Sequence, residues 1–531
     1  MEASDPDLRA AKRYRPDASG EDLDPDAAFW PSHVETRDGP LSSFFDAVLE
    51  ERPDLRERVR VVRSAGGSPA SRDAGFVLYW ARGNALRTEE NPALDVAKLC
   101  AEFLELPLVA LFHLSEAGST RRRHMFLLQG WKEVCEELER EGIRAVCHVA
   151  RPGRRNPSYM TMACRAALVV SEEPFTNPLL EDARRVALAP GNGVAPLALV
   201  DASCVLPARL CPPGKDLRAY AFEAATKASR RARISAAYAK VGRGGPAATP
   251  SLGLPISSDD LDDIGALVSL CHVDQAVASV SSTPGGQRHA NRRWRDWIDG
   301  GGLAGYALRR NNPLDESGSS RMSAYVNAGM VSPFRLAREG KSDHKFFQEY
   351  QTWRELGYSF VFRRPVTHNT IGCLPAWAQR TLRGRAEDGR AARLSLRDLE
   401  EGRTPEPLWN AMQMALVKTG ELHNNLRMTW GKAIHHWSAS PEEALERLEH
   451  LNNKYALDGS APPSYVGILW CFGGFDSPSK RGEVPVLGSV KPKPVSAYRR
   501  VSAQALLRKH GLSSKPAGQP SVISLLQRGS R

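Results

Sequence analysis

A change in hydrophobic periodicity in the middle of the chain constrains the fold more than any other feature. Between residues 75 and 207, short apolar runs of strand length alternate with amphipathic stretches of helical period. Beyond residue 261 the pattern is helical to about residue 453, and Gly and Pro separate the helices. Strands that alternate with helices form parallel sheets covered on both faces. The sequence therefore predicts an α/β domain followed by an all-α domain.

The elements expected in the α/β domain follow from these runs. We expect strands at residues 76–80, 108–114, 145–150, 166–171 and 197–200, and helices at residues 93–104 and 123–141. The region has no G-x-G-x-x-G motif, so the pattern does not support a dinucleotide-binding domain. A parallel sheet can still hold a planar ligand at the carboxyl ends of its strands.

The remaining segments have weaker patterns. Residues 1–72 are rich in Asp, Arg, Pro and Ser, which predicts a mostly disordered extension with one helix near residues 42–51. Residues 208–260 are basic and rich in Ala, Gly and Pro, as in a linker, with a helix expected in the first half. We therefore place the helical domain at residues 261–490 and a basic flexible tail at residues 491–531.

Composition narrows the class of protein. The 531 residues include 72 Lys and Arg against 61 Asp and Glu, a formal charge of +11 that favours polyanions such as nucleic acid but also fits Arg-rich solvated faces. No apolar run approaches the roughly 20 residues of a membrane span, and residues 1–25 do not resemble a signal peptide. Nine cysteines occur without a CxxC pair, so we predict neither a metal site nor a disulfide scaffold. We expect an intracellular protein, cytoplasmic in a bacterium, with a nucleus or plastid left open.

Tryptophans stand at ordered spacings in the helical region. Trp430 and Trp437 lie seven residues apart, which places them on one face of a single helix, and Trp409 lies upstream. One interpretation is a Trp-lined helix interface. The other is a chain of indoles along which an electron can hop, because indole radicals are accessible and tunnelling falls steeply with distance.

Two further patterns suggest a ligand site. Glu349 and Trp353 share one helix face at i, i+4, and Trp353 would clamp a flat base with Trp470 if the fold joins them. Residues 318–323 form a loop of Gly, small hydroxyls and one Arg before an expected helix, a combination that favours phosphate. Ser-rich helix caps are also common, so this loop alone is a weak indication.

Taken in order, these and further segments resemble the photolyase/cryptochrome family, and specifically its class II cyclobutane pyrimidine dimer (CPD) photolyases. The matching segments include Tyr79-Trp80, Arg122-Arg123-His124, Arg310-Asn311-Asn312-Pro313, Ser320–Ser323, Pro407–Asn410, Arg427-Met428, Ser440-Pro441-Glu442 and Leu457-Asp458-Gly459. The resemblance runs from about residue 75 to residue 490. It implies a Rossmann-like photolyase domain followed by an all-α FAD-binding domain.

The resemblance assigns roles around FAD. It implies that the cofactor is held by Tyr306, Ser319, Ser320, Arg321, Met322, Ser323, Asn424, Arg427, Asn452, Asp458 and Gly459. Within this set, Arg427 and Asp458 match a salt bridge beside the isoalloxazine ring, and Asn452 matches the asparagine that faces flavin N5. Asn424 matches the other main photolyase class, in which an asparagine lies near both flavin and lesion.

It also assigns roles in catalysis and DNA binding. Trp409, Trp430 and Trp437 match the tryptophan chain that photoreduces the flavin. Glu349 matches the carboxyl that hydrogen-bonds the dimer, and we expect it to act as a protonated donor beside an apolar clamp. Trp353 and Trp470 match that clamp, and the lesion contacts expected overall are Arg310, Glu349, Trp353, Asn424 and Trp470.

The function implied is light-driven DNA repair, in which fully reduced, anionic FAD gives an electron to a flipped-out dimer in single- or double-stranded DNA. The resemblance also implies a deazaflavin-type antenna chromophore in the α/β domain, and we expect a monomer. The chain departs from the class II pattern at Ala324, Asn424 and Pro463. Two alternatives therefore stay open, a cryptochrome-like blue-light photoreceptor and a non-catalytic DNA-binding protein on the same scaffold.

Overall fold

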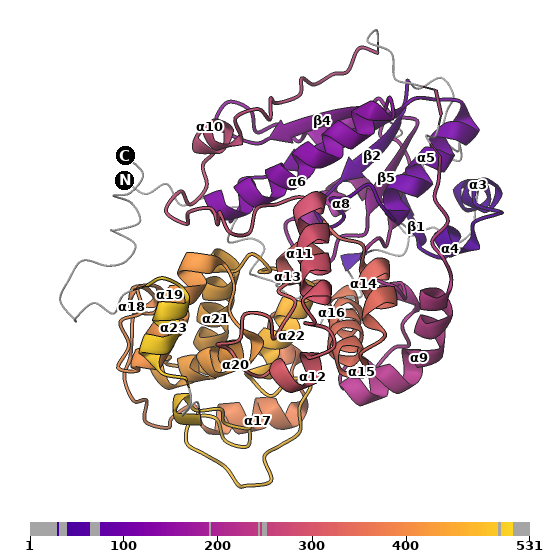
Figure 1. Cartoon of the computed structure of the whole chain (residues 1–531). Helices are drawn as coiled ribbons and strands as arrows, with labels where there is room; N and C mark the ends of the chain where they lie inside the picture. Colours follow the sequence, from indigo (N-terminus) through magenta and orange to yellow (C-terminus); the bar gives the residue numbers. More distant parts are fainter. Residues whose placement is uncertain are drawn as a thin grey trace, which may run out of the picture.

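The computed structural model describes residues 29–30, 40–63, 75–190, 193–242, 245–246, 252–497 and 501–512. A six-stranded sheet organises the first domain, with strand order β1-β6-β5-β2-β3-β4 (Figure 1). Its strands are β1 (Val59–Arg63), β2 (Val77–Ala81), β3 (Leu108–Leu114), β4 (Arg144–Val149), β5 (Leu168–Glu172) and β6 (Leu197–Val200). All neighbouring strands are parallel except β1, which pairs antiparallel with β6.

Helices cover both faces of this sheet. Every residue of β2 is buried, and alternate residues of this strand belong to different core clusters. The helices that share a core cluster with one face are α5 (Pro92–Leu104) and α6 (Arg121–Arg140), and those that share the other cluster are α7 (Ser158–Ala163) and α8 (Leu179–Ala187). A strand buried on both faces must be apolar throughout, which explains the continuous apolar runs in the sequence. The prediction of an α/β domain is confirmed.

The rest of the chain is helical, which confirms the second half of the predicted fold class (Figure 1, magenta to yellow). The helices are α9 (Ala219–Ser235), α10 (Ile264–Ser269), α11 (Gln287–Asp299), α12 (Tyr306–Arg309), α13 (Ser323–Asn327), α14 (Pro333–Gly340), α15 (His344–Phe347), α16 (Trp353–Phe362), α17 (Ala376–Gly384), α18 (Leu396–Glu400), α19 (Pro407–Thr419), α20 (Asn424–Ala433), α21 (Pro441–Tyr455), α22 (Pro462–Trp470) and α23 (Ala503–Lys509). Short 3-10 or π turns are η1 (Ala208–Leu210), η2 (Gln348–Thr352), η3 (Ile371–Cys373), η4 (Ile434–Trp437) and η5 (Val495–Ala497).

Local sequence explains where several helices begin. Asn91 caps α5 by accepting hydrogen bonds from the amides of Ala93 and Leu94, and a proline follows it at the first helical position. Thr120 caps α6 in the same way, and Ser440 caps α21. These polar caps satisfy amides that have no partner within the helix, so the sequence sets the starts of the main helices.

The N-terminal segment differs from the expected extension. Helix α3 (Pro40–Val48) lies where one helix was expected, whereas α4 (Pro53–Arg56) and β1 were not expected. Phe45 and Leu55 are fully buried in the main core. The alternation in Val59–Arg63 is short and bounded by charge, which hid the edge strand in the sequence. The other residues of the expected extension, 1–28, 31–39 and 64–72, lie outside the described residues.

The C-terminal segment also differs from the expected flexible tail. Helix α23 packs against α19 and buries Leu506 and Leu507. Ser502 caps it, and Gly511 follows its end at φ 62°. These are ordinary start and stop signals, and a basic, Ser-rich composition masked them. Residues 498–500 and 513–531 of the expected tail lie outside the described residues.

The two domains are locked together at the carboxyl side of the sheet. The guanidinium of Arg122 on α6 donates to the carbonyls of Ala278, Val417 and Tyr455 in the helical domain. Gly329 has φ 63° and approaches the backbone of residue 84 so closely that a Cβ would lie 2.1 Å from its oxygen. The helical domain is thereby fixed against the sheet. Within the described ranges, no helix has the length and apolar character that crossing a membrane requires.

Candidate functional site

A cavity of about 800 Å³ lies within the helical domain. Its walls come from α12, α13, η2, α16, α20, α22 and α23 and from the loops between them. Of the predicted site residues, those that line it are Tyr306, Arg310, Ser319, Ser320, Arg321, Met322, Ser323, Glu349, Trp353, Asn424, Arg427, Asp458 and Trp470. The volume is within the range of ligand pockets. The fold therefore gathers residues spread over more than 160 positions of sequence into one space.

One end of the cavity has the character of an anion site. The hydroxyls of Ser320 and Ser323 line it and have no hydrogen-bond partner among the residues that the structure describes. The guanidinium of Arg321 lies beside them, held by Glu421 at 2.7 Å, and its backbone has φ 52°. Free hydroxyls beside a cation suit a diphosphate, so this end fits the phosphate side of FAD.

A second ion pair lines the same cavity. Arg427 on α20 makes a bidentate contact with Asp458, with nitrogen–oxygen distances of 3.0 and 3.2 Å. Both side chains are mostly buried, and both line the cavity. Bidentate geometry fixes the guanidinium plane. This rigid ion pair could therefore hydrogen-bond the polar edge atoms of a planar heterocycle.

Two of the predicted cofactor residues do not line this space. Asn452 is buried at 1 % exposure, and its amide nitrogen donates to Ser464 Oγ at 2.7 Å. Ser464 does line the cavity, so Asn452 stands one contact behind the wall. Gly459 uses its carbonyl to accept hydrogen bonds from Arg123 and Asn327, which makes it a domain-joining turn. For these two residues, the expected direct contact with the cofactor stays a prediction.

Glu349 has surroundings that we did not expect. It belongs to the π turn η2 and contacts Arg310 at 3.0 Å and Lys345 at 2.6 Å. These two cations replace the apolar surroundings that we expected for this carboxyl, and its role as a hydrogen-bond donor to the dimer stays a prediction. The basic residue Lys345 stands four positions earlier in the sequence, as in an ordinary helical ion pair, so nothing in the pattern marked it as part of the site.

Trp353 and Trp470, the indole pair, meet at the cavity wall. Their ring centroids lie 4.7 Å apart with an angle of 23° between the planes, so the two rings stack on each other. From the sequence we expected these two residues to hold a base between them if the fold joined them. The stack leaves no space for a base between the rings. A base would instead lie against the face that the pair turns to the cavity.

Trp409, Trp430 and Trp437, the indole trio, lie away from the cavity lining and are 0, 0 and 3 % exposed. Trp409 stacks on Trp430 at 6.1 Å between centroids and meets Trp437 edge-on at 5.2 Å. The helix α20 ends at Ala433, so Trp430 and Trp437 do not share one α-helical face, and Trp409 stands between them. The order from the cavity outward is Trp430, Trp409, Trp437, because residues 424–428 of α20 line the cavity.

Several lining residues escaped the sequence reasoning. Glu421 pairs with both Arg321 and Arg293, and Lys509 and His510 reach the cavity from α23. Burial lowers the pKa of Lys509 below its usual range, and burial together with the Lys509 charge lowers the pKa of His510. The Ser502 cap and the Gly511 stop were the signals that could have revealed α23.

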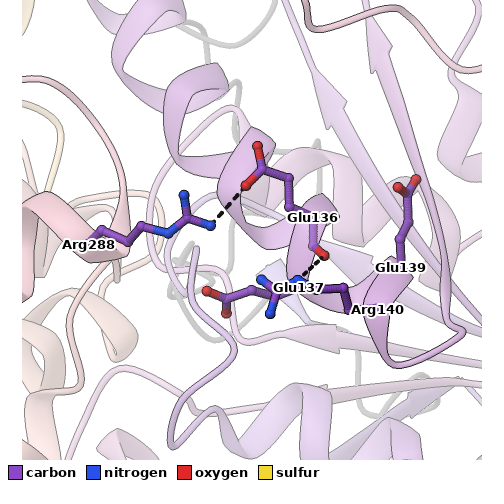
Figure 2. A pocket seen from close by; sticks show the side chains of 5 residues that line it. All are labelled: Glu136, Glu137, Glu139, Arg140 and Arg288. Carbon is purple, nitrogen blue, oxygen red and sulfur yellow. Dashed lines mark hydrogen bonds and ion pairs between the residues drawn. The ribbon is translucent and has the colours of Figure 1, made fainter.

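A second depression, on the surface of the molecule, differs from this cavity in the character of its lining. This surface depression of about 870 Å³ is lined by Glu136, Glu137, Glu139, Arg140 and Arg288. Figure 2 shows the side chains of these five residues. Arg288 pairs with Glu136 at 2.9 Å across the domain boundary. Such exposed pairs contribute little to stability, and the five side chains that line this depression are all charged, unlike the largely apolar lining of a typical ligand pocket.

Sequence comparison finds relatives across most of the chain. The sequence model of the DNA photolyase family matches residues 77–237. The deoxyribodipyrimidine photo-lyase of Potorous tridactylus is 30 % identical over 434 residues, which is 80 % of this chain and 78 % of the relative. That of Methanothermobacter thermautotrophicus is 29 % identical over 424 residues, 78 % of this chain and 90 % of the relative.

Solved structures share the fold. An archaeal photolyase from Sulfolobus tokodaii, described with two FAD molecules, has a TM-score of 0.56 at 15 % identity and covers 76 % of this chain and 84 % of its own. A cryptochrome from Synechocystis has a TM-score of 0.57 at 16 % identity, with 76 % and 83 % covered. A class III photolyase from Agrobacterium tumefaciens has a TM-score of 0.55 at 18 % identity, with 84 % and 86 % covered.

Proposed function

This chain belongs to the deoxyribodipyrimidine photo-lyase family of light-dependent DNA-repair enzymes, and on that premise we propose that it splits cyclobutane pyrimidine dimers by electron transfer from FAD. The observation that carries the proposal is the shared cavity. The residues matched to the cofactor and those matched to the lesion line one space of about 800 Å³. Electron transfer from cofactor to lesion needs this proximity.

The cavity has residues that would suit two parts of FAD. Ser320, Ser323 and Arg321 would hold the diphosphate, and Arg427 with Asp458 would hold the polar edge of the ring system. When bound, fully reduced and excited by light, the flavin would supply the electron that opens the cyclobutane ring. The protein would supply position, exclusion of water and the charges around the dimer.

The lesion side of the cavity would bind the dimer by stacking and hydrogen bonding. The flipped-out bases would lie against the indole pair, whose large apolar face favours a base over water. Glu349 would form a hydrogen bond with the dimer, with Arg310 and Lys345 at ion-pair distance from its carboxyl group. Arg310 also lines the cavity, where it would meet a DNA phosphate.

Binding to DNA would be salt-sensitive and independent of sequence. The formal charge of +11 favours phosphate contacts, which release counterions and do not read bases. Such binding suits an enzyme that must find a lesion in any sequence. We propose UV-damaged DNA, single- or double-stranded, as the partner of a monomeric chain.

We also propose that the α/β domain holds a second, light-collecting chromophore, of deazaflavin type. Arg82 follows β2 at the carboxyl edge of the sheet, 3 % exposed, and none of its three guanidinium nitrogens has a hydrogen-bond acceptor within the described ranges. Its charge lies over the Trp80 ring at 4.1 Å, and burial lowers its pKa to about 10. A planar anion would satisfy this guanidinium, so Arg82→Met should remove the second chromophore and spare FAD.

One assay tests the repair function against both alternatives. Protein reduced chemically and illuminated with an oligonucleotide that contains a thymine dimer should restore intact thymines, with a sample kept in the dark as control. A photoreceptor would bind FAD and respond to light without restoring thymines. A non-catalytic DNA-binding protein would bind the damaged oligonucleotide and stay inert to light. Either of these results contradicts the proposal.

A further inference from the structure

The cavity wall at the start of α22 carries a hydroxyl whose hydrogen bonds can be traced atom by atom. Ser464 is half-buried and lines the cavity. Asn452, 1 % exposed and behind it, donates from its amide nitrogen Nδ2 to Ser464 Oγ at 2.7 Å. The inference from these contacts rests on the proposed function, because it takes flavin as the ligand of the cavity.

A backbone amide fixes the direction of these hydrogen bonds. The N–H of Ser460 can only donate, and it lies 2.8 Å from Asn453 Oδ1, so this atom is the oxygen of that side chain. Asn452 Nδ2 lies 3.0 Å from the same oxygen, so it must be the nitrogen that donates. One hydrogen of the Asn452 amide therefore points to Asn453 and the other to Ser464.

This orientation decides which group can donate to a ligand. Asn452 has no N–H left to offer, because both hydrogens of its amide group have acceptors in the protein. A hydroxyl has one donor and two acceptor sites, and Asn452 occupies one acceptor site of Ser464. The hydroxyl proton has no acceptor among the residues that the structure describes. Ser464 therefore keeps one donor and one acceptor site for a ligand in the cavity.

The position of Ser464 along α22 relates it to the ring system of the flavin. Asp458, which pairs with Arg427, lies in the turn that leads into α22, and Ser464 lies in the first turn of that helix. Trp470 of the indole pair is the last residue of the same helix. The rise between Ser464 and Trp470 is about 9 Å along the helix axis. The hydroxyl is thus on the side of the ion pair, where the polar edge of the ring would lie.

We propose that Ser464 is the residue that hydrogen-bonds N5 of the flavin, and that Asn452 is a positioning residue that holds the Ser464 hydroxyl. N5 accepts a hydrogen bond in oxidised flavin and carries a hydrogen in reduced flavin, whereas the ring carbonyls accept and N3 donates in both states. A hydroxyl with one free donor and one free acceptor site serves both states of N5 by rotation. The resemblance implied that Asn452 itself faces N5, and Ser464 was not among the predicted site residues.

The test compares FAD with 5-deaza-FAD, in which a C–H group replaces N5 and cannot accept a hydrogen bond. Each is titrated calorimetrically into the full chain freed of cofactor. The unaltered protein should bind FAD more tightly than 5-deaza-FAD. In Ser464→Ala this preference should fall by about two- to tenfold, the effect of one neutral hydrogen bond. An unchanged preference in Ser464→Ala, or equal affinities in the unaltered protein, would overturn the proposal.

Two controls separate this role from packing. Ser279→Ala removes another hydroxyl of the cavity lining and should leave the preference for FAD over 5-deaza-FAD unchanged. In Ser464→Ala the preference for FAD over 1-deaza-FAD, which lacks ring nitrogen N1, should also stay the same. A loss of this second preference in place of the first would overturn the assignment to N5. A chain that binds no FAD at all would contradict the proposed function itself, which is a different failure.

The role of Asn452 is tested with the same preference for FAD over 5-deaza-FAD. Asn452→Leu should lower this preference less than Ser464→Ala does, because the hydroxyl remains but is no longer held. In the double variant the preference should equal that of Ser464→Ala alone, since Asn452 acts only through the hydroxyl. A further fall in the double variant would mean that Asn452 contacts the flavin directly, contrary to the proposal.

Discussion

The helical domain holds two groups of tryptophans in opposite environments. The indole trio, Trp409, Trp430 and Trp437, is sealed from solvent almost completely, and its members contact one another in a line. The indole pair, Trp353 and Trp470, is half-buried and forms part of the cavity wall. The same side chain can thus serve two purposes, since electron hopping needs close contact in a dry interior and stacking needs a face open to a ligand.

We therefore predict a different effect for changes in each group. Changes in the trio should affect light-driven reduction of the flavin and spare DNA binding. Changes in the pair should affect DNA binding and spare light-driven reduction. A single variant that loses both light-driven reduction of the flavin and DNA binding would contradict this separation of roles.

The largest effect is expected for Trp430→Phe. Phenylalanine is much harder to oxidise than indole, so light-driven reduction of the flavin should be abolished while the packing is nearly kept. Flavin absorbance under illumination measures this. Repair by chemically reduced protein should remain, and Trp377→Phe, a half-buried tryptophan outside both groups, is the matched control. Normal photoreduction in Trp430→Phe would contradict the order of the trio.

A pH effect on stability is expected beside the trio. Burial, with the Lys432 charge, lowers the pKa of His435 to about 3, against about 6.5 in an unfolded chain. The unfolded state therefore binds the proton first, so His435 should cost the folded state up to about 3 kcal/mol as the pH falls from 6.5 to 4.

Chemical denaturation at a series of pH values measures the effect. In His435→Leu, the free energy of unfolding should fall less steeply as the pH decreases. His423 at the cavity has a pKa lowered by burial to about 4, so the change in His423→Leu should be smaller. If the free energy of unfolding depended on pH equally in the two variants, His435 would be no more strongly desolvated than His423, which contradicts the prediction.

The next effect is expected for the pair. Trp353→Ala removes one stacking surface, which is worth about 1–3 kcal/mol per base, so affinity for dimer-containing DNA should fall by roughly tenfold or more. Fluorescence anisotropy with damaged and undamaged oligonucleotides measures this. Affinity for undamaged DNA should stay the same, because phosphate contacts supply it. An equal loss for both oligonucleotides would place the pair outside the lesion site.

The smallest effect is expected for Lys509 on α23. If its ammonium meets the phosphates of FAD, Lys509→Met should weaken FAD binding by about fivefold, a partly exposed charge being screened by solvent. Riboflavin lacks phosphate, so its affinity should not change. Arg508→Met, on the exposed side of the same helix, is the control. A loss with riboflavin as large as that with FAD would mean that α23 acts only through packing.

The fold was predictable where periodicity is strong, as in the buried strands and in α5 and α6. Edge strand β1 and helix α23 were missed, because five residues of alternation and one capped heptapeptide are weak against a charged background. The site followed from a resemblance rather than from chemistry visible in the residues. The contacts of Glu349 with Arg310 and of Gln413 with Trp430 join elements that are distant in the sequence, and sequence spacing holds no information about them.

The most direct test of the account is the absorbance spectrum of the purified chain beside that of Ser320→Trp, which would fill the proposed diphosphate end of the cavity. The account predicts flavin absorbance in the unaltered protein, retained or restored by reconstitution with FAD, and its loss in the variant with the fold intact by circular dichroism. An unaltered protein that stays colourless after reconstitution, or a variant that keeps a full complement of this flavin, would contradict it.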